Sequence, residues 1–125
     1  MARILFVDDY QDALTMWAFY LRTRGFDVVT AQDARAALAL AASSRPDVVV
    51  TDLVLPGMGG CEMARELRKL PSMGEVPFIA TTGDTDPDHL EAARSAGFVR
   101  ILIKPCDPPQ LVGEIDRALG AVARA

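Results

Sequence analysis

The chain has 125 residues, of which 50% are apolar and 24% are charged, with a formal net charge of −4. This length suits one domain that buries its own core, and an acidic chain without a basic stripe argues against direct binding to nucleic acid. The apolar runs are far shorter than the roughly 20 residues of a membrane span, and residues 1–3 lead straight into a predicted strand, which leaves no room for a signal peptide. We therefore expect a cytoplasmic protein without a membrane partner.

Short apolar runs bounded by turn residues predict buried strands, and the segments between them have helical periodicity. Gly25 is a natural stop for the first helical segment. In chain order the predicted elements are a strand over 4–7, a helix over 10–24, a strand from 28, a helix over 33–43, a strand over 48–51, a helix over 61–70, a strand over 78–81, a helix over 87–97, a strand over 101–103 and a helix from 107.

Three aspartates stand where helices are expected to begin. Asp33, Asp86 and Asp107 each suit the capping position, and Pro108 suits the first turn of the last helix. The periodicity of that helix predicts a buried face composed of Leu111, Val112, Ile115, Leu119 and Val122.

The first helix is more apolar than one buried face requires. Its predicted buried face consists of Ala13, Trp17, Tyr20 and Leu21. Phe19 falls nearly opposite this face, and we hypothesise that Phe19 with Met16 contributes to a partner or dimer surface.

Strands and helices alternate five times, which predicts an α/β fold with one parallel sheet and helices on both of its faces. The natural strand order for five such units is 2-1-3-4-5, as in flavodoxin-like folds. In that order the first and third strands are neighbours, so Asp8, Asp9 and Asp52 would meet at one edge of the sheet. Residues 1–125 are expected to form this single domain, with no second domain attached.

Polar residues follow four of the predicted strands. Asp8 and Asp9, Asp52, Thr82 and Lys104 each come at the end of an apolar run, where ligands of open parallel sheets bind. Clustered carboxylates repel one another unless a cation neutralises them, and Mg²⁺ with its oxygen ligands suits this role. A carboxylate at such a site can also act as a nucleophile toward phosphorus, with Lys104 and Thr82 stabilising the phosphoryl oxygens.

In these features the chain resembles the receiver domains of two-component response regulators, over essentially its whole length. The matching residues are the acidic pair Asp8-Asp9, the acceptor position Asp52, Thr82 followed by Gly83, and Lys104-Pro105. The resemblance implies that Asp52 accepts a phosphoryl group, that Thr82 and Lys104 contact it, and that the peptide bond before Pro105 is cis.

The resemblance also implies a cofactor and partners. Mg²⁺ would be bound by Asp9, Asp52 and the backbone carbonyl of Val54, with Asp8 assisting. The phosphoryl donor would be a histidine kinase or a histidine phosphotransfer protein. The protein would act by docking to a downstream protein, and a dimer formed on phosphorylation is one such assembly. It would catalyse its own phosphorylation and dephosphorylation without turning over an outside substrate.

Some positions depart from the family pattern. Many receivers have an aromatic residue three positions before the lysine, where this chain has Ile101, and a small residue where it has Phe98. The positions two residues after the acceptor and two after the threonine, which tend to set phosphoryl lifetime in the family, are Val54 and Asp84.

Alternative functions stay open at this point. A phosphorylation-independent docking module would keep the fold, and Ile101 is compatible with it. A phosphohydrolase with an aspartate nucleophile is disfavoured because Val54 stands where such enzymes usually have a second aspartate. A flavin-binding carrier is disfavoured because Asp8 and Asp9 would repel a phosphate. The cysteines match no metal-binding spacing and are expected to be free thiols, and His89 is expected to be exposed.

Overall fold

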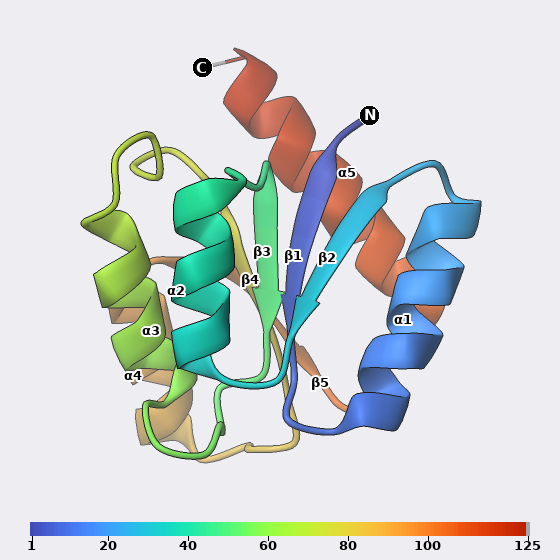
Figure 1. Cartoon of the computed structure of the whole chain (residues 1–125). Coiled ribbons are helices and arrows are strands. Elements are labelled where there is room, and N and C mark those ends of the chain that lie inside the picture. Colours follow the sequence, from blue (N-terminus) through green and yellow to red (C-terminus); the bar gives the residue numbers. More distant parts are fainter. Residues whose placement is uncertain (125) are drawn as a thin grey trace.

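The computed structural model describes residues 1–124, with side chains up to residue 121, and in this range five strands alternate with five helices (Figure 1). The strands are β1 (Arg3–Val7), β2 (Asp27–Ala31), β3 (Val48–Thr51), β4 (Phe78–Thr82) and β5 (Phe98–Ile103). The helices are α1 (Gln11–Thr23), α2 (Ala34–Ser43), α3 (Gly60–Arg68), α4 (Pro87–Ser95) and α5 (Pro108–Arg124). The predicted α/β alternation is confirmed.

The strands form one parallel sheet in the order β2-β1-β3-β4-β5, so the predicted flavodoxin-like topology is also confirmed. The arrows of β1, β2 and β3 point to the lower edge of the sheet in Figure 1, and the loops that leave the strands gather there. Because all strands run in one direction, the residues that follow them share that edge. None of the helices within residues 1–124 is both long and apolar enough to cross a membrane.

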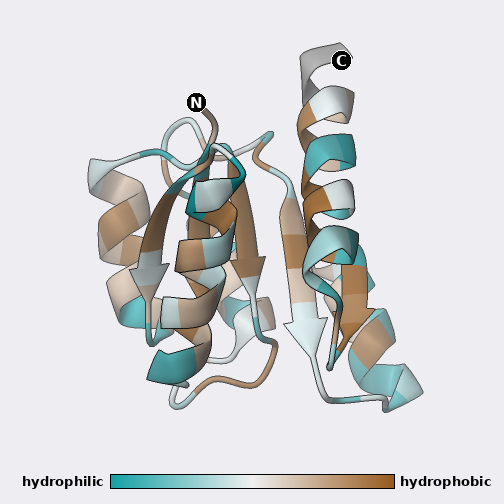
Figure 2. Ribbon diagram, turned by 90° about the vertical axis from the view of Figure 1, so that its right-hand side faces the viewer, coloured by the Kyte–Doolittle hydropathy of each residue, from teal (hydrophilic) through white to brown (hydrophobic). Residues whose placement is uncertain are grey.

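The sheet separates two apolar clusters. Side chains of a strand alternate between its two faces, and β1 is buried on both, with Ile4 and Phe6 on one side and Leu5 and Val7 on the other. The first side is covered by α1 and α5, and the second by α2, α3 and the buried face of α4. Figure 2 shows mostly brown strands and, beside them, the helix α5 with alternating brown and teal bands. Each fully buried Leu or Ile contributes about 1.5–3 kcal/mol to folding.

The predicted helix caps and faces agree with the structure in most respects. The Asp33 side chain accepts a hydrogen bond from the Ala36 amide, and the Asp86 side chain accepts one from Asp88. The buried face of α1 contains Trp17 and Leu21, as expected, and also Leu14 and Ala18, whereas Ala13 and Tyr20 are only partly buried. On α5, Leu111, Val112 and Ile115 are buried and Leu119 is partly buried, whereas the side chain of Val122 lies outside the described residues.

The last strand is longer than the sequence predicts, because it begins at Phe98 rather than Ile101. The Phe98 ring packs against Phe78, with ring centroids 6.0 Å apart. Val99 and Arg100 are exposed because β5 is an edge strand, and Arg100 forms an ion pair with Glu114 of α5. Arg100 interrupts the apolar run, so the sequence pattern predicted the strand only from Ile101 onward.

Candidate functional site

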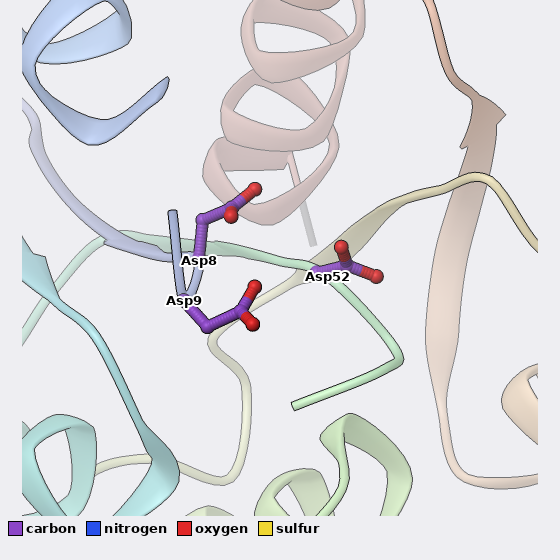
Figure 3. Close-up of side chains that lie close together, drawn as sticks. All are labelled: Asp8, Asp9 and Asp52. Atoms are coloured by element: carbon purple, nitrogen blue, oxygen red, sulfur yellow. The ribbon is translucent and has the colours of Figure 1, made fainter. Parts of the chain in front are cut away.

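The ends of β1 and β3 bring three carboxylates together. Val7 and Thr51 are paired across the two strands, so the residues that follow, Asp8 and Asp52, are also side by side. Asp9 comes next in the chain, and one oxygen of each carboxylate lies within 4.8 Å of the others (Figure 3). Asp8 and Asp52 are buried, whereas Asp9 is exposed to solvent. The predicted acidic cluster therefore exists and is open on one side.

Hydrogen bonds fix the two buried carboxylates. The Asp52 amide donates to the Val7 carbonyl at 3.0 Å, which extends the pairing of β1 and β3 by one residue. One oxygen of Asp8 accepts from the Tyr10 amide at 2.9 Å, and one oxygen of Asp52 accepts from the Val54 amide at 3.0 Å. These bonds leave the second oxygen, Oδ2, of each carboxylate free for another partner.

Lys104 binds both of those second oxygens. Its ammonium nitrogen lies 3.0 Å from Asp8 Oδ2 and 2.8 Å from Asp52 Oδ2. Its amide donates to the Thr82 carbonyl at 2.8 Å, and the Lys104–Pro105 peptide bond is cis, in agreement with the expectation. Burial disfavours the charged form of Lys104, but the hydrogen bonds to Asp52 and Asp8 outweigh this effect, so the pKa of Lys104 is raised. The lysine therefore stays protonated at neutral pH.

The charges of the cluster do not balance, because Lys104 brings one positive charge to three carboxylates and pairs only with Asp8 and Asp52. Carboxylates at this spacing repel one another unless a further cation is present. Hard divalent cations with oxygen ligands suit such a set, and Mg²⁺ keeps several waters, which the exposed side at Asp9 can accommodate. The residues present therefore fit a magnesium ion.

Thr82 is at the end of β4 but its hydroxyl is turned to the next loop. The side chain is fully buried, and Thr82 Oγ1 accepts a hydrogen bond from the Asp84 amide at 3.1 Å. Within the described residues, the Thr82 hydroxyl forms no hydrogen bond to Asp52 or Lys104. Its neighbour Thr81, in contrast, lines a cavity together with Asp8 and Lys104. Thr82 is therefore connected to Lys104 by a backbone hydrogen bond and not by its side chain.

The loop after Asp52 approaches the site closely. The Gly60 amide donates to the Leu53 carbonyl at 3.0 Å, and α3 begins at this residue. A β-carbon on Gly60 would lie 2.6 Å from the Asp52 carbonyl oxygen, so only glycine fits without a shift of the backbone. Val54 lies in the same loop and is 62% exposed.

One contact beside the site was not anticipated from the sequence. His89 is exposed, as expected, but its Nδ1 lies 2.6 Å from Asp84 Oδ2. Both residues line a cleft of about 340 Å³ together with Val54 and Leu55 of the loop that follows Asp52. The spacing of five residues across the turn at Asp86-Pro87 is the one signal that could have suggested this pair.

Comparisons with known proteins agree with the fold. Residues 4–116 match the family described as the response regulator receiver domain. A response regulator receiver protein of Anaeromyxobacter sp. is 39% identical over 112 residues, which cover 90% of this chain and 46% of that protein. This chain therefore spans less than half of that relative's length.

Solved structures are similar as well. The chemotaxis protein CheY4 of Vibrio cholerae has a TM-score of 0.90 at 32% identity, covering 94% of this chain and 98% of that one. The receiver domain of the sensor histidine kinase PA1611 of Pseudomonas aeruginosa has a TM-score of 0.87 at 29% identity, covering 95% and 98%. That structure contains a magnesium ion in its active site cleft.

Proposed function

Because the chain belongs to the response regulator receiver family, we propose that it is a phosphorylation-dependent signalling switch with Asp52 as the phosphoryl acceptor. The observation that carries the proposal is the cluster at the sheet edge, where Asp52 is held between Asp8, Asp9 and Lys104. In the proposed role the phosphoryl group biases an equilibrium between two conformations, and a partner reads the difference.

The proposed reaction needs little beyond positioning and charge. One carboxylate oxygen of Asp52 bonds to phosphorus as the P–N bond of a phosphohistidine breaks, and the electron pair of that bond returns to the imidazole. Lys104 supports this role because its ammonium already lies 2.8 Å from an Asp52 oxygen, close to where the phosphoryl oxygens would lie. Thr82 would have to turn its hydroxyl from Asp84 toward the phosphoryl group.

We propose that the ion bound at the acidic cluster is Mg²⁺. Its ligands would be Asp9, Asp52 and the Val54 carbonyl, with Asp8 assisting, and it would neutralise charge on a phosphoryl oxygen. Support comes from the three converging carboxylates and from the related receiver domain that contains magnesium in its cleft.

We propose a histidine kinase or a histidine phosphotransfer protein as the donor and a downstream protein as the reader, with the cytoplasm as the place of action. On α1 the residues Phe19 and Met16 are 72% and 51% exposed, which supports a contact with a partner or with a second copy of the chain. Phe19→Ser should then slow phosphotransfer from the kinase, or abolish dimer formation, without changing uptake from a small phosphodonor. If kinase docking and oligomeric state are both unaffected, this part of the proposal is wrong.

The experiment that tests the function is intact-mass spectrometry after incubation with acetyl phosphate, with and without Mg²⁺. Wild-type protein should gain one phosphoryl group only when Mg²⁺ is present, and Asp52→Asn should gain none. Asp116→Asn, a change of the same kind at an exposed site on α5, is the matched control and should behave like the wild type. If the wild type gains no phosphoryl group and binds no Mg²⁺, the chain is a docking module that does not depend on phosphorylation.

A further inference from the structure

The single histidine of the chain lies at the point where β4 passes into α4. His89 belongs to the first turn of α4, and its Nδ1 contacts Asp84 Oδ2 in the loop before the helix. The Asp84 side chain is only 23% exposed, whereas that of His89 is 64% exposed. The pair therefore connects a surface side chain to a residue packed closer to the site.

Asp84 connects this pair to Thr82, because its amide and its carboxylate both form hydrogen bonds. The amide of Asp84 donates to Thr82 Oγ1 at 3.1 Å. The other carboxylate oxygen of Asp84 accepts from the Asp86 amide at 2.9 Å. Asp84 is thus held at three points, by the threonine, by the loop and by His89, and Thr82 cannot turn away without moving it or losing a bond.

We propose that His89 is a positioning residue of the switch, which acts through Asp84 as a latch that holds the loop after β4, and with it Thr82, in the unphosphorylated arrangement. This inference rests on the proposed function, because it assumes that Thr82 turns toward a phosphoryl group on Asp52. It goes further by naming the contact that opposes the turn and by connecting Thr82 to helix α4 through Asp84.

Helix stability alone does not explain this histidine. The start of α4 is already capped by Asp86, whose side chain accepts from the Asp88 amide, and Pro87 occupies the first turn. When protonated, a histidine near the amino end of a helix opposes the helix dipole, and the contact with Asp84 offsets this effect. The pair also lines the cleft of about 340 Å³ together with Leu53, Val54 and Leu55, the residues that directly follow the proposed acceptor in the chain.

The test measures the initial rate of Asp52 phosphorylation by limiting acetyl phosphate at saturating Mg²⁺, again by intact mass. His89→Ala should raise this rate by about two- to tenfold, the range expected for loss of one hydrogen bond that favours the resting state. His89→Gln keeps a donor for Asp84 and should restore a rate near that of the wild type. Arg94→Ala breaks an exposed ion pair with Glu91 on the same helix and should leave the rate unchanged.

A double-mutant cycle shows whether His89 acts through Asp84. In an Asp84→Ala background, His89→Ala should cause no further change in rate. The latch proposal is wrong if the rate of His89→Ala is equal to or below that of the wild type. It is also wrong if His89→Ala still raises the rate in the Asp84→Ala background. A purely structural role would lower the unfolding midpoint without raising the rate. If the wild type itself takes up no phosphoryl group, the proposed function fails, and this outcome is distinct from a latch that has no effect.

Discussion

Replacing Gly60 with alanine adds one methyl group at the closest approach between α3 and the end of β3. The new β-carbon would lie 2.6 Å from the Asp52 carbonyl oxygen and 2.9 Å from the Leu53 α-carbon. Both neighbours are backbone atoms, so the strain cannot be relieved by rotating a side chain. The start of α3 would have to move away from the segment that carries the proposed acceptor.

The expected size of the effect follows from two opposing terms. Inserting a methyl group into a tightly packed place costs about 1–3 kcal/mol, and replacing glycine by alanine within a helix returns about 0.5–1 kcal/mol. The net loss of stability should therefore be up to about 2.5 kcal/mol. Gly113 in α5 is the matched control, because a β-carbon there has no neighbour within 4 Å. Gly113→Ala should stabilise the protein by up to about 1 kcal/mol.

Urea unfolding followed by the fluorescence of Trp17, the only tryptophan, measures both variants. Trp17 is buried and stacks on Phe6 with ring centroids 5.8 Å apart, so its emission reports the loss of the core. Mg²⁺ affinity measured on the same samples should fall for Gly60→Ala and stay constant for Gly113→Ala. If Gly60→Ala proves as stable as Gly113→Ala, α3 does not pack against Asp52 as closely as described.

Three further results are expected. Lys104→Met removes the ammonium between Asp8 and Asp52, so the rate of phosphorylation by acetyl phosphate should fall about a hundredfold. The same change should tighten Mg²⁺ binding in calorimetric titrations, and equal or weaker Mg²⁺ binding would contradict this charge argument. Arg68→Met removes the guanidinium that donates to three backbone carbonyls of the loop before β4, at 2.6 to 3.2 Å. It should lower the free energy of unfolding in urea by about 2–3 kcal/mol. Lys69→Met, which breaks an exposed ion pair with Glu66, should change it by less than about 0.5 kcal/mol. The pKa of His89 is raised from its ordinary 6.5 by the hydrogen bond to Asp84 and by the neighbouring aspartates, so its contribution to stability is full below pH 6.5 and is lost as the pH rises through the raised value. The proton NMR titration of this single histidine should show a midpoint above 6.5 that falls in Asp84→Asn, and an unchanged midpoint in that variant would refute the pairing.

The sheet topology and the acidic cluster were predictable from sequence because both follow from simple local patterns. Apolar runs of four or five residues mark strands that are buried on both faces, and parallel strands bring the residues that follow them to one edge. This rule alone places Asp8, Asp9 and Asp52 together. The neighbouring Lys104 follows from the same rule applied to the last strand.

Contacts that depend on side-chain direction were not predictable in this way. The hydroxyl of Thr82 is turned toward Asp84, although its position on the strand was expected correctly. The pair of Asp84 and His89 depends on the shape of a turn, and a sequence pattern does not specify that shape. The early start of β5 at Phe98 was hidden because an edge strand tolerates exposed residues that break the apolar run.

The separation of the apolar interior into two clusters has a consequence for how such a protein can diversify. The helix that exposes Phe19 belongs to the layer of α1 and α5, whereas the helix that carries His89 belongs to the opposite layer, with α2 and α3. Substitutions that repack one layer meet few side chains of the other, since the sheet lies between them. The proposed partner contact through α1 and the proposed response through α4 are therefore free to evolve separately, and chimaeras that exchange one layer at a time should retain the function of the layer that was kept.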